Sequence, residues 1–228
     1  MTDLRGRAGQ TGPRRVSDGQ PVDLRATRDG TPFTAEWYTA LALEGKCFIV
    51  NHGVASTAVA CNTAWLETEP DVYIYVPDNI VVLPVSIYLA IEDTVAAAAT
   101  IDVNAVASSV GDDTVSGSAL TVMNIRTDAP ESSSVTATGT VTGTSASTPY
   151  AGNYYEFWRP ITGAVINNAA AGAGGYNYAF QWSALEEGIP PMVVGTGSLS
   201  LYCGALTASQ ALIYSGVTWA ELPESAIA

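Results

Sequence analysis

Hydrophobic and polar residues alternate along much of the chain after residue 45. In the clearest run, Val85, Ile87, Leu89 and Ile91 alternate with Ser86, Tyr88, Ala90 and Glu92. A period of two places alternate side chains on the same face of a strand, so this run predicts a half-buried β-strand. Further segments with strand character are 46–51, 71–76, 100–107, 118–125, 135–141, 154–166, 176–182, 198–203 and 210–219. Clusters of glycine, proline, aspartate and serine between them predict turns.

One segment, residues 34–45, has the pattern of a short helix. Thr34 is a favourable N-cap, Trp37 and Leu41 are four residues apart, and Gly45 can end the helix. The remaining segments predict short strands, and some of the connections are too long for simple hairpins. The sequence therefore predicts an all-β protein, a jelly-roll-like antiparallel β-sandwich with at most one short helix.

The first 32 residues lack this periodicity and are rich in glycine and proline. We expect residues 1–32 to form an extended N-terminal arm and residues 33–228 to form the sandwich domain. Six of the nine basic residues of the chain lie in this arm: Arg5, Arg7, Arg14, Arg15, Arg25 and Arg28.

Charge is divided unequally between the two parts. Six arginines and four aspartates give residues 1–30 a net charge of +2, whereas three basic and 18 acidic residues give residues 31–228 a net charge of −15. A cationic arm on an anionic body predicts attachment to another surface through the arm. A terminus without any partner fits the same composition equally well. The charge of the body opposes nucleic-acid binding, which we do not expect.

The residue types that carry most enzyme chemistry are sparse. His52 is the only histidine, and the sequence Asn51-His52-Gly53 predicts a surface turn without a special role. No Gly-x-Ser-x-Gly sequence offers a nucleophile. The three cysteines, Cys47, Cys61 and Cys203, lack the spacing of zinc ligands, so we interpret them as small core hydrophobes. We expect no catalytic residue, metal or cofactor, and therefore no enzyme.

Other polar and apolar patterns add little chemistry. Asp112 and Asp113 are interpreted as solvated turn carboxylates rather than calcium ligands. No stretch approaches the roughly 18 apolar residues needed to span a bilayer, so no membrane protein is expected. The first residues also lack the apolar run of a signal peptide.

Aromatic residues gather in two segments. Tyr176, Tyr178, Phe180 and Trp182 alternate strictly and so share one sheet face, which predicts either sandwich core or an oligomer interface. Residues 150–159 are also rich in aromatics, and Tyr154, Tyr155 and Trp158 are candidates for the rim of a sugar-binding groove.

Several segments resemble virion structural proteins of tailed bacteriophages. They are residues 20–38, 69–77, 82–89, 197–204 and 214–223. In their residue composition and their order along the chain, these segments are similar to those of a jelly-roll capsid decoration, or cement, protein. This resemblance implies a homotrimeric knob on the capsid surface of a virion, with N-terminal arms that run over the coat shell. Its partners would be the major capsid protein and neighbouring copies of the chain, contacted through the six arm arginines.

The resemblance leaves other roles open, because phage jelly-roll domains also serve as coat, fibre, spike and baseplate components. The alternative function is a carbohydrate-binding or receptor-binding spike or fibre domain. A third hypothesis is a β-sandwich hydrolase, which would need two carboxylates converging in a pocket.

Overall fold

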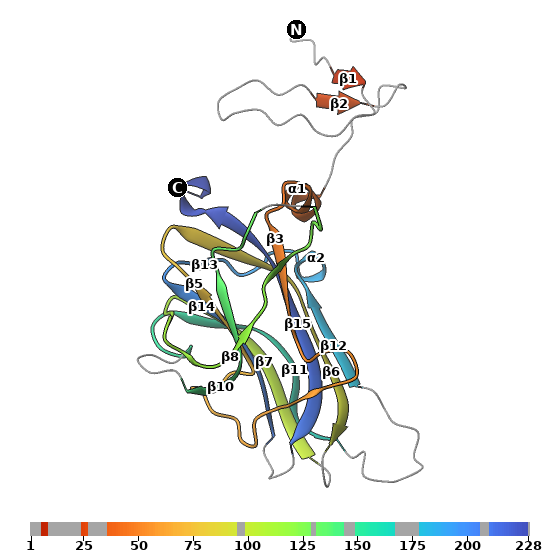
Figure 1. The fold of residues 1–228 in the computed structure, drawn as a ribbon, viewed down its shortest axis with the longest axis vertical. Helices are drawn as coiled ribbons and strands as arrows, with labels where there is room; N and C mark the ends of the chain where they lie inside the picture. Colours follow the sequence, from red (N-terminus) through yellow and green to blue (C-terminus); the bar gives the residue numbers. More distant parts are fainter. Residues whose placement is uncertain are drawn as a thin grey trace. The chain divides into compact units, whose positions relative to one another are not determined.

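The computed structural model describes residues 6–8, 24–26, 36–94, 99–128, 131–143, 149–166, 178–205 and 210–227. The chain divides into two compact units, residues 1–40 and residues 41–228. In the second unit, two β-sheets built from antiparallel pairs pack as a sandwich (Figure 1). The prediction of an antiparallel β-sandwich with one short helix near its start is confirmed.

The first sheet has seven strands. Its main path is β12 (Tyr178–Ser183), β6 (Ile80–Thr94), β15 (Ala211–Pro223), β3 (Cys47–His52) and β9 (Met123–Asn124), with β13 (Val193–Val194) beside β6 and β4 (Val59–Ala60) beside β15. The second sheet has six strands, in the order β11 (Tyr154–Ile166), β7 (Ala99–Ser108), β14 (Gly197–Ala205), β5 (Val72–Val76), β10 (Thr136–Gly143) and β8 (Ser116–Leu120). The chain passes repeatedly from one sheet to the other, for example from β5 to β6 to β7, as in jelly-roll topologies.

One predicted strand is divided between the sheets. Residues 118–125 form the end of β8 in the six-stranded sheet and then β9 in the seven-stranded sheet. Val122 lies between the two strands and packs against the core. The apolar pattern of the segment is therefore maintained while its hydrogen-bond partners change from β10 to β3.

Helix α1 (Trp37–Leu43) stops where the sequence predicts. Gly45 has a φ of +75°, a left-handed conformation that glycine adopts without a steric penalty. Its N–H donates to the Ala42 carbonyl at 3.0 Å, and the Lys46 N–H donates to the Leu41 carbonyl at 2.9 Å. These two bonds form a Schellman motif that satisfies the last carbonyls of the helix. The predicted N-cap, Thr34, lies outside the described residues.

Two further helical turns, α2 (Ala184–Glu187) and η1 (Glu224–Ala226), were not predicted.

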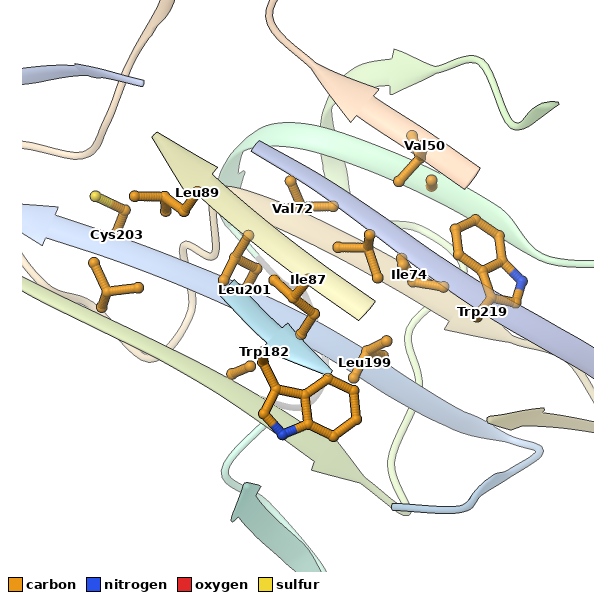
Figure 2. Close-up of a cluster of buried hydrophobic side chains, with 14 of the residues drawn as sticks. Val50, Val72, Ile74, Ile87, Leu89, Trp182, Leu199, Leu201, Cys203 and Trp219 are labelled. Carbon is orange, nitrogen blue, oxygen red and sulfur yellow. The ribbon is translucent and has the colours of Figure 1, made fainter. Parts of the chain in front are cut away.

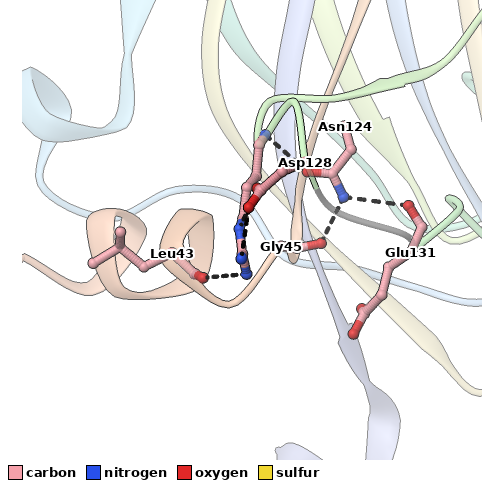
Figure 3. A network of polar contacts seen from close by, with 6 residues as sticks. Leu43, Gly45, Asn124, Asp128 and Glu131 are labelled. Atoms are coloured by element: carbon pink, nitrogen blue, oxygen red, sulfur yellow. Dashed lines mark hydrogen bonds and ion pairs between the residues drawn. The ribbon is translucent and has the colours of Figure 1, made fainter. Parts of the chain in front are cut away.

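A polar network fixes the end of α1 to the segment after β9 (Figure 3). The Asn124 side-chain amide donates to the Gly45 carbonyl at 2.7 Å and to the Glu131 carbonyl at 3.3 Å. Arg126 donates to the Leu43 carbonyl at 3.1 Å and forms a 2.7 Å ion pair with Asp128. Arg126 therefore serves the internal structure of the body.

The core lies between the sheets and follows the predicted alternation (Figure 2). Ile87, Leu89 and Ile91 of β6 are buried, and Ile87 and Leu89 lie close to Leu199 and Leu201 of β14 in the core between the sheets. Val85 is only half-buried, because pairing of β6 with β15 skips this residue and forms a bulge beside Pro84. The three cysteines are buried, as interpreted from the sequence, and they form no disulfide among the described residues.

The outer face of the six-stranded sheet is covered as well. Some residues of this sheet alternate with the core positions and point away from the core. They are nevertheless buried: Tyr73, Asn104, Ser198, Ser200 and Tyr202. The turn after β7 is one of the covering segments, because the Asp112 N–H donates to the Tyr73 hydroxyl at 2.7 Å. Asp112 is buried and its carboxylate accepts hydrogen bonds from the backbone and hydroxyl of Thr114. The prediction of a solvated carboxylate is therefore wrong for Asp112, although Asp113 is exposed.

Candidate functional site

The arm arginines are described at two positions only. Arg7 lies in β1 (Gly6–Ala8) and Arg25 in β2 (Leu24–Ala26), and the two are register partners in a parallel pair. Arg5, Arg14, Arg15 and Arg28 lie outside the described residues. The boundary between the two compact units falls after Ala40.

All three basic residues of the body are already paired. Lys46 contacts Glu131 at 2.6 Å, Arg126 contacts Asp128 at 2.7 Å, and Arg159 contacts Glu156 at 2.7 Å. These ion pairs are partly or largely exposed and contribute little stability each. They do show that every lysine and arginine of residues 41–228 already has a carboxylate partner within the body.

The aromatic face of β12 lies partly in the core of the sandwich. Trp182 is buried, and its ring meets Phe157 edge-on with centroids 4.9 Å apart. Phe180 is partly buried against the same core, and Tyr178 is 37% exposed. Tyr176 lies outside the described residues. Packing within one chain accounts for Trp182 and Phe180, so these two side chains give no reason to expect an oligomer.

The aromatic residues of β11 do not form one binding face. Tyr154 is 51% exposed and Tyr155 is 61% exposed, but adjacent residues of a strand point to opposite faces. Tyr154 packs edge-on against Tyr150, whereas Tyr155 stacks on Phe157, which contacts the core. Trp158 is also packed against the core.

Tyr150 belongs to a polar and aromatic cluster on the outer face of the six-stranded sheet. Its hydroxyl donates to Glu156 at 2.9 Å and accepts a hydrogen bond of 2.5 Å from the Asn104 amide. Burial, followed by the bond to Glu156, raises the pKa of this phenol above its usual value. The Asn104 amide oxygen accepts from the Trp65 indole at 3.3 Å. The partners satisfy one another, so this cluster is best explained as a structural support for the loops.

A pocket of about 810 Å³ near the end of β3 is lined by residues of both sheets. It is lined by Asn51, His52, Gly53, Val54, Ala55, Thr57, Val59, Tyr88, Ser118, Ala119, Leu120, Thr121, Met123, Thr140 and Tyr214. These residues come from β3, β4, β6, β8, β9, β10 and β15 and from the segments that follow β3 and β8. The size lies within the range of about 300–1,000 Å³ that is usual for small-molecule sites.

His52 forms part of the inner wall of this pocket. The side chain is only 4% exposed, so the prediction of a surface turn histidine is wrong. Its Nε2 atom lies 3.1 Å from the Thr140 hydroxyl, and Nδ1 is buried without a hydrogen-bond partner among the described residues. Burial lowers the pKa of the imidazole below its usual value, so the ring is neutral at neutral pH. Thr140 has a φ of +48°, a strained conformation for a β-branched residue and a feature often found at functional sites.

Three glycines make room for the three ring side chains of the pocket. A Cβ atom on Gly139 would lie 2.7 Å from His52 Nε2, and one on Gly53 would lie 2.8 Å from the Tyr214 ring. At Gly216 a Cβ atom would meet the ring of Tyr88. Isolated glycines in strand patterns often mark such close approaches, and this is the sequence signal that indicates the pocket.

Comparison with family models, with curated proteins and with solved structures finds no match to this chain. The site is therefore defined by its geometry. None of the helices in the described residues is long and apolar enough to cross a bilayer.

A second buried polar group lies at the start of β5. The Asp71 carboxylate accepts a hydrogen bond from the Cys203 N–H, and the Cys61 and Cys203 thiols lie beside it. Burial, reinforced by Cys61, raises the pKa of Asp71 well above its usual value. Among the described residues, no three histidine, cysteine, aspartate or glutamate side chains form a metal-binding group.

We expect Asp71 to make the protein less stable as the pH rises above about 4, where the carboxyl of the unfolded chain ionises. The folded state keeps the proton until its raised pKa, so the unfolded state is favoured by ionisation throughout that interval. Asp71→Asn removes this contribution while keeping a similar shape. Urea unfolding at several pH values should show the stability of the wild type falling relative to the variant. Parallel curves would show that Asp71 is already ionised when folded.

Proposed function

We propose that the chain is a structural virion protein of the capsid decoration, or cement, type. It binds the outer shell of a bacteriophage head through its N-terminal arm and stabilises that shell. Its partners are the major capsid protein and neighbouring copies of the same chain, and its location is the capsid surface. The proposal assigns it no catalytic role.

The division of charge is the observation that carries this proposal. The three cations of the body form ion pairs with Glu131, Asp128 and Glu156. The arginines of the arm therefore supply the positive charge that binds an acidic groove on the capsid. The body is strongly anionic and repels other copies of itself at long range. Such a body can bind to a capsid shell together with other copies when a cationic segment supplies the attachment.

Homotrimers are part of the proposal, because a closed trimer matches a three-fold position of an icosahedral shell. Trp182 of β12 is buried in the core of one chain and Phe180 packs against that core, so we place the trimer contact on other surfaces. Light scattering at micromolar concentration should give the mass of three chains. A stable monomer under those conditions would contradict this part of the proposal.

Replacing the six arm arginines by glutamine should weaken capsid binding and its dependence on salt. At about 0.5 kcal/mol for each exposed ion pair, the loss is about 3 kcal/mol, or roughly 100-fold in Kd. The measurement is co-sedimentation with capsids of the encoding virus from which this protein has been stripped, at several salt concentrations.

The matched control replaces the four arm aspartates by asparagine, Asp3, Asp18, Asp23 and Asp29. This variant changes the same segment but keeps its cations, so its binding should be retained or increased. Equal binding by both variants would show that arm charge plays no part in attachment.

A further inference from the structure

The His52 pocket differs from the surface around it in charge. Residues 31–228 carry a net charge of −15, yet none of the residues that line the pocket is Asp, Glu, Lys or Arg. His52 is neutral because burial lowers its pKa, and the phenols of Tyr88 and Tyr214 have raised pKa values for the same main reason. The Glu92 carboxylate accepts a hydrogen bond of 3.5 Å from the Tyr214 hydroxyl, but Glu92 is not a lining residue. The lining therefore offers no cation, which disfavours phosphates and nucleotides as ligands.

Two ring side chains of the pocket, Tyr88 of β6 and Tyr214 of β15, lie on the same face of the seven-stranded sheet and are held in place from behind. Tyr88 lies against Gly216 and Tyr214 against Gly53, where a larger residue would displace each ring. Tyr88 is also fixed by its hydroxyl, which donates to the Asn51 side-chain oxygen at 3.1 Å. A binding site of rings that are positioned before a ligand arrives loses little conformational entropy on binding.

The pocket also supplies neutral hydrogen-bonding groups between its apolar walls. The hydroxyls of Thr57, Ser118 and Thr121 and the amide of Asn51 line it. His52 is more than nine-tenths buried, and its Nδ1 atom has no partner among the described residues. Buried polar atoms are rarely left unpaired, and the exceptions often mark sites where a ligand or water binds.

We infer that this pocket binds a neutral saccharide. The faces of a sugar ring present C–H groups that pack on aromatic side chains, and its hydroxyls both donate and accept hydrogen bonds. The combination of tyrosine rings, neutral hydroxyls and an amide suits such a ligand. A purely apolar ligand would leave the polar groups unpaired, and an anionic ligand would find no cation. The site lies wholly within residues 41–228, and it stands whether or not the arm binds a capsid.

The test uses the full chain and a set of neutral probes: glucose, galactose, N-acetylglucosamine, maltose, lactose and chitobiose. Saturation-transfer NMR should detect binding of at least one, with transfer strongest at ring C–H groups, and titration then gives its Kd. Asn51→Ala removes a polar group, and Ala55→Trp fills the pocket from an exposed position. Each variant should raise the Kd at least tenfold.

Tyr155→Ala is the control, because Tyr155 is more exposed than either pocket tyrosine and does not line the pocket. It should leave the Kd unchanged, and thermal unfolding verifies that all three variants remain folded. The inference is wrong if none of the six sugars binds at millimolar concentration, or if binding is unaffected by both pocket variants. Selective binding of charged glycans or of a neutral peptide at this pocket would overturn it as well.

Discussion

Deletion of residues 1–28 is expected to abolish capsid decoration and to leave the body folded. The deletion removes all six arm arginines, whereas the buried hydrophobic residues of the described chain all lie from Cys47 to Ala220. Loss of the ion pairs and backbone hydrogen bonds of the arm should lower affinity by more than the roughly 100-fold expected for the charge variant. Co-sedimentation with stripped capsids measures this loss, and circular dichroism verifies the β-sandwich.

A full-length variant with the first 28 residues in shuffled order is the control for this deletion. It keeps the composition and charge of the arm and tests whether their order is needed. Binding by the shuffled variant would assign attachment to charge alone. If the truncated protein instead occupied capsids at the wild-type level, attachment would have to come from the surface of the sandwich.

The second large effect is expected at Trp219, where substitution by alanine should destabilise the body by about 3–5 kcal/mol. Trp219 is fully buried in β15 and packs on Phe48 with ring centroids 6.4 Å apart. Its indole N–H donates to the buried Glu221 carboxylate at 2.9 Å. The same carboxylate accepts from the Ser134 N–H and the Ser133 hydroxyl, so the indole belongs to a network that fixes the segment before β10.

Urea unfolding at neutral pH measures the change at Trp219 as a lower midpoint. Tyr155→Ala, which removes an exposed aromatic ring, should cost less than about 1 kcal/mol. Similar costs for the two substitutions would contradict the central position assigned to Trp219 in the core.

The strands could be predicted because their signal is local. The alternation from Ile87 to Ile91 corresponds to one buried face of β6, and each other segment with strand character contains at least one observed strand. The sequence signal for the end of α1 is also local, because Gly45 adopts the left-handed conformation that ends a helix. These features depend on a few neighbouring residues, so a sequence pattern is enough to find them.

The errors arose where distant segments decide the environment of a residue. His52 was predicted at the surface because Asn-His-Gly is typical of a turn, but Gly139 leaves space for its ring and Thr140 contacts its Nε2 atom. Asp112 was misjudged for a similar reason, because Tyr73 holds its turn against the sheet. Neither partner is near in sequence, so local patterns could not reveal the contact.

The aromatic face of β12 illustrates a limit of another kind. The sequence predicts that Tyr178, Phe180 and Trp182 share a face, but core and oligomer interface have the same pattern. The structure places Trp182 against Phe157 within one chain. The saccharide pocket was not predicted at all, although the glycines at 53, 139 and 216 mark the places where its rings lie close to the backbone.

The central claim, attachment to a capsid exterior through the arm, is tested most directly by an electron-microscopy map of intact particles of the encoding virus. We predict density for the β-sandwich outside the coat shell at three-fold positions, with residues 1–28 lying along coat subunits. Density for the sandwich within the coat shell itself, at the tail or fibres, or with no arm contact to the coat would contradict the claim.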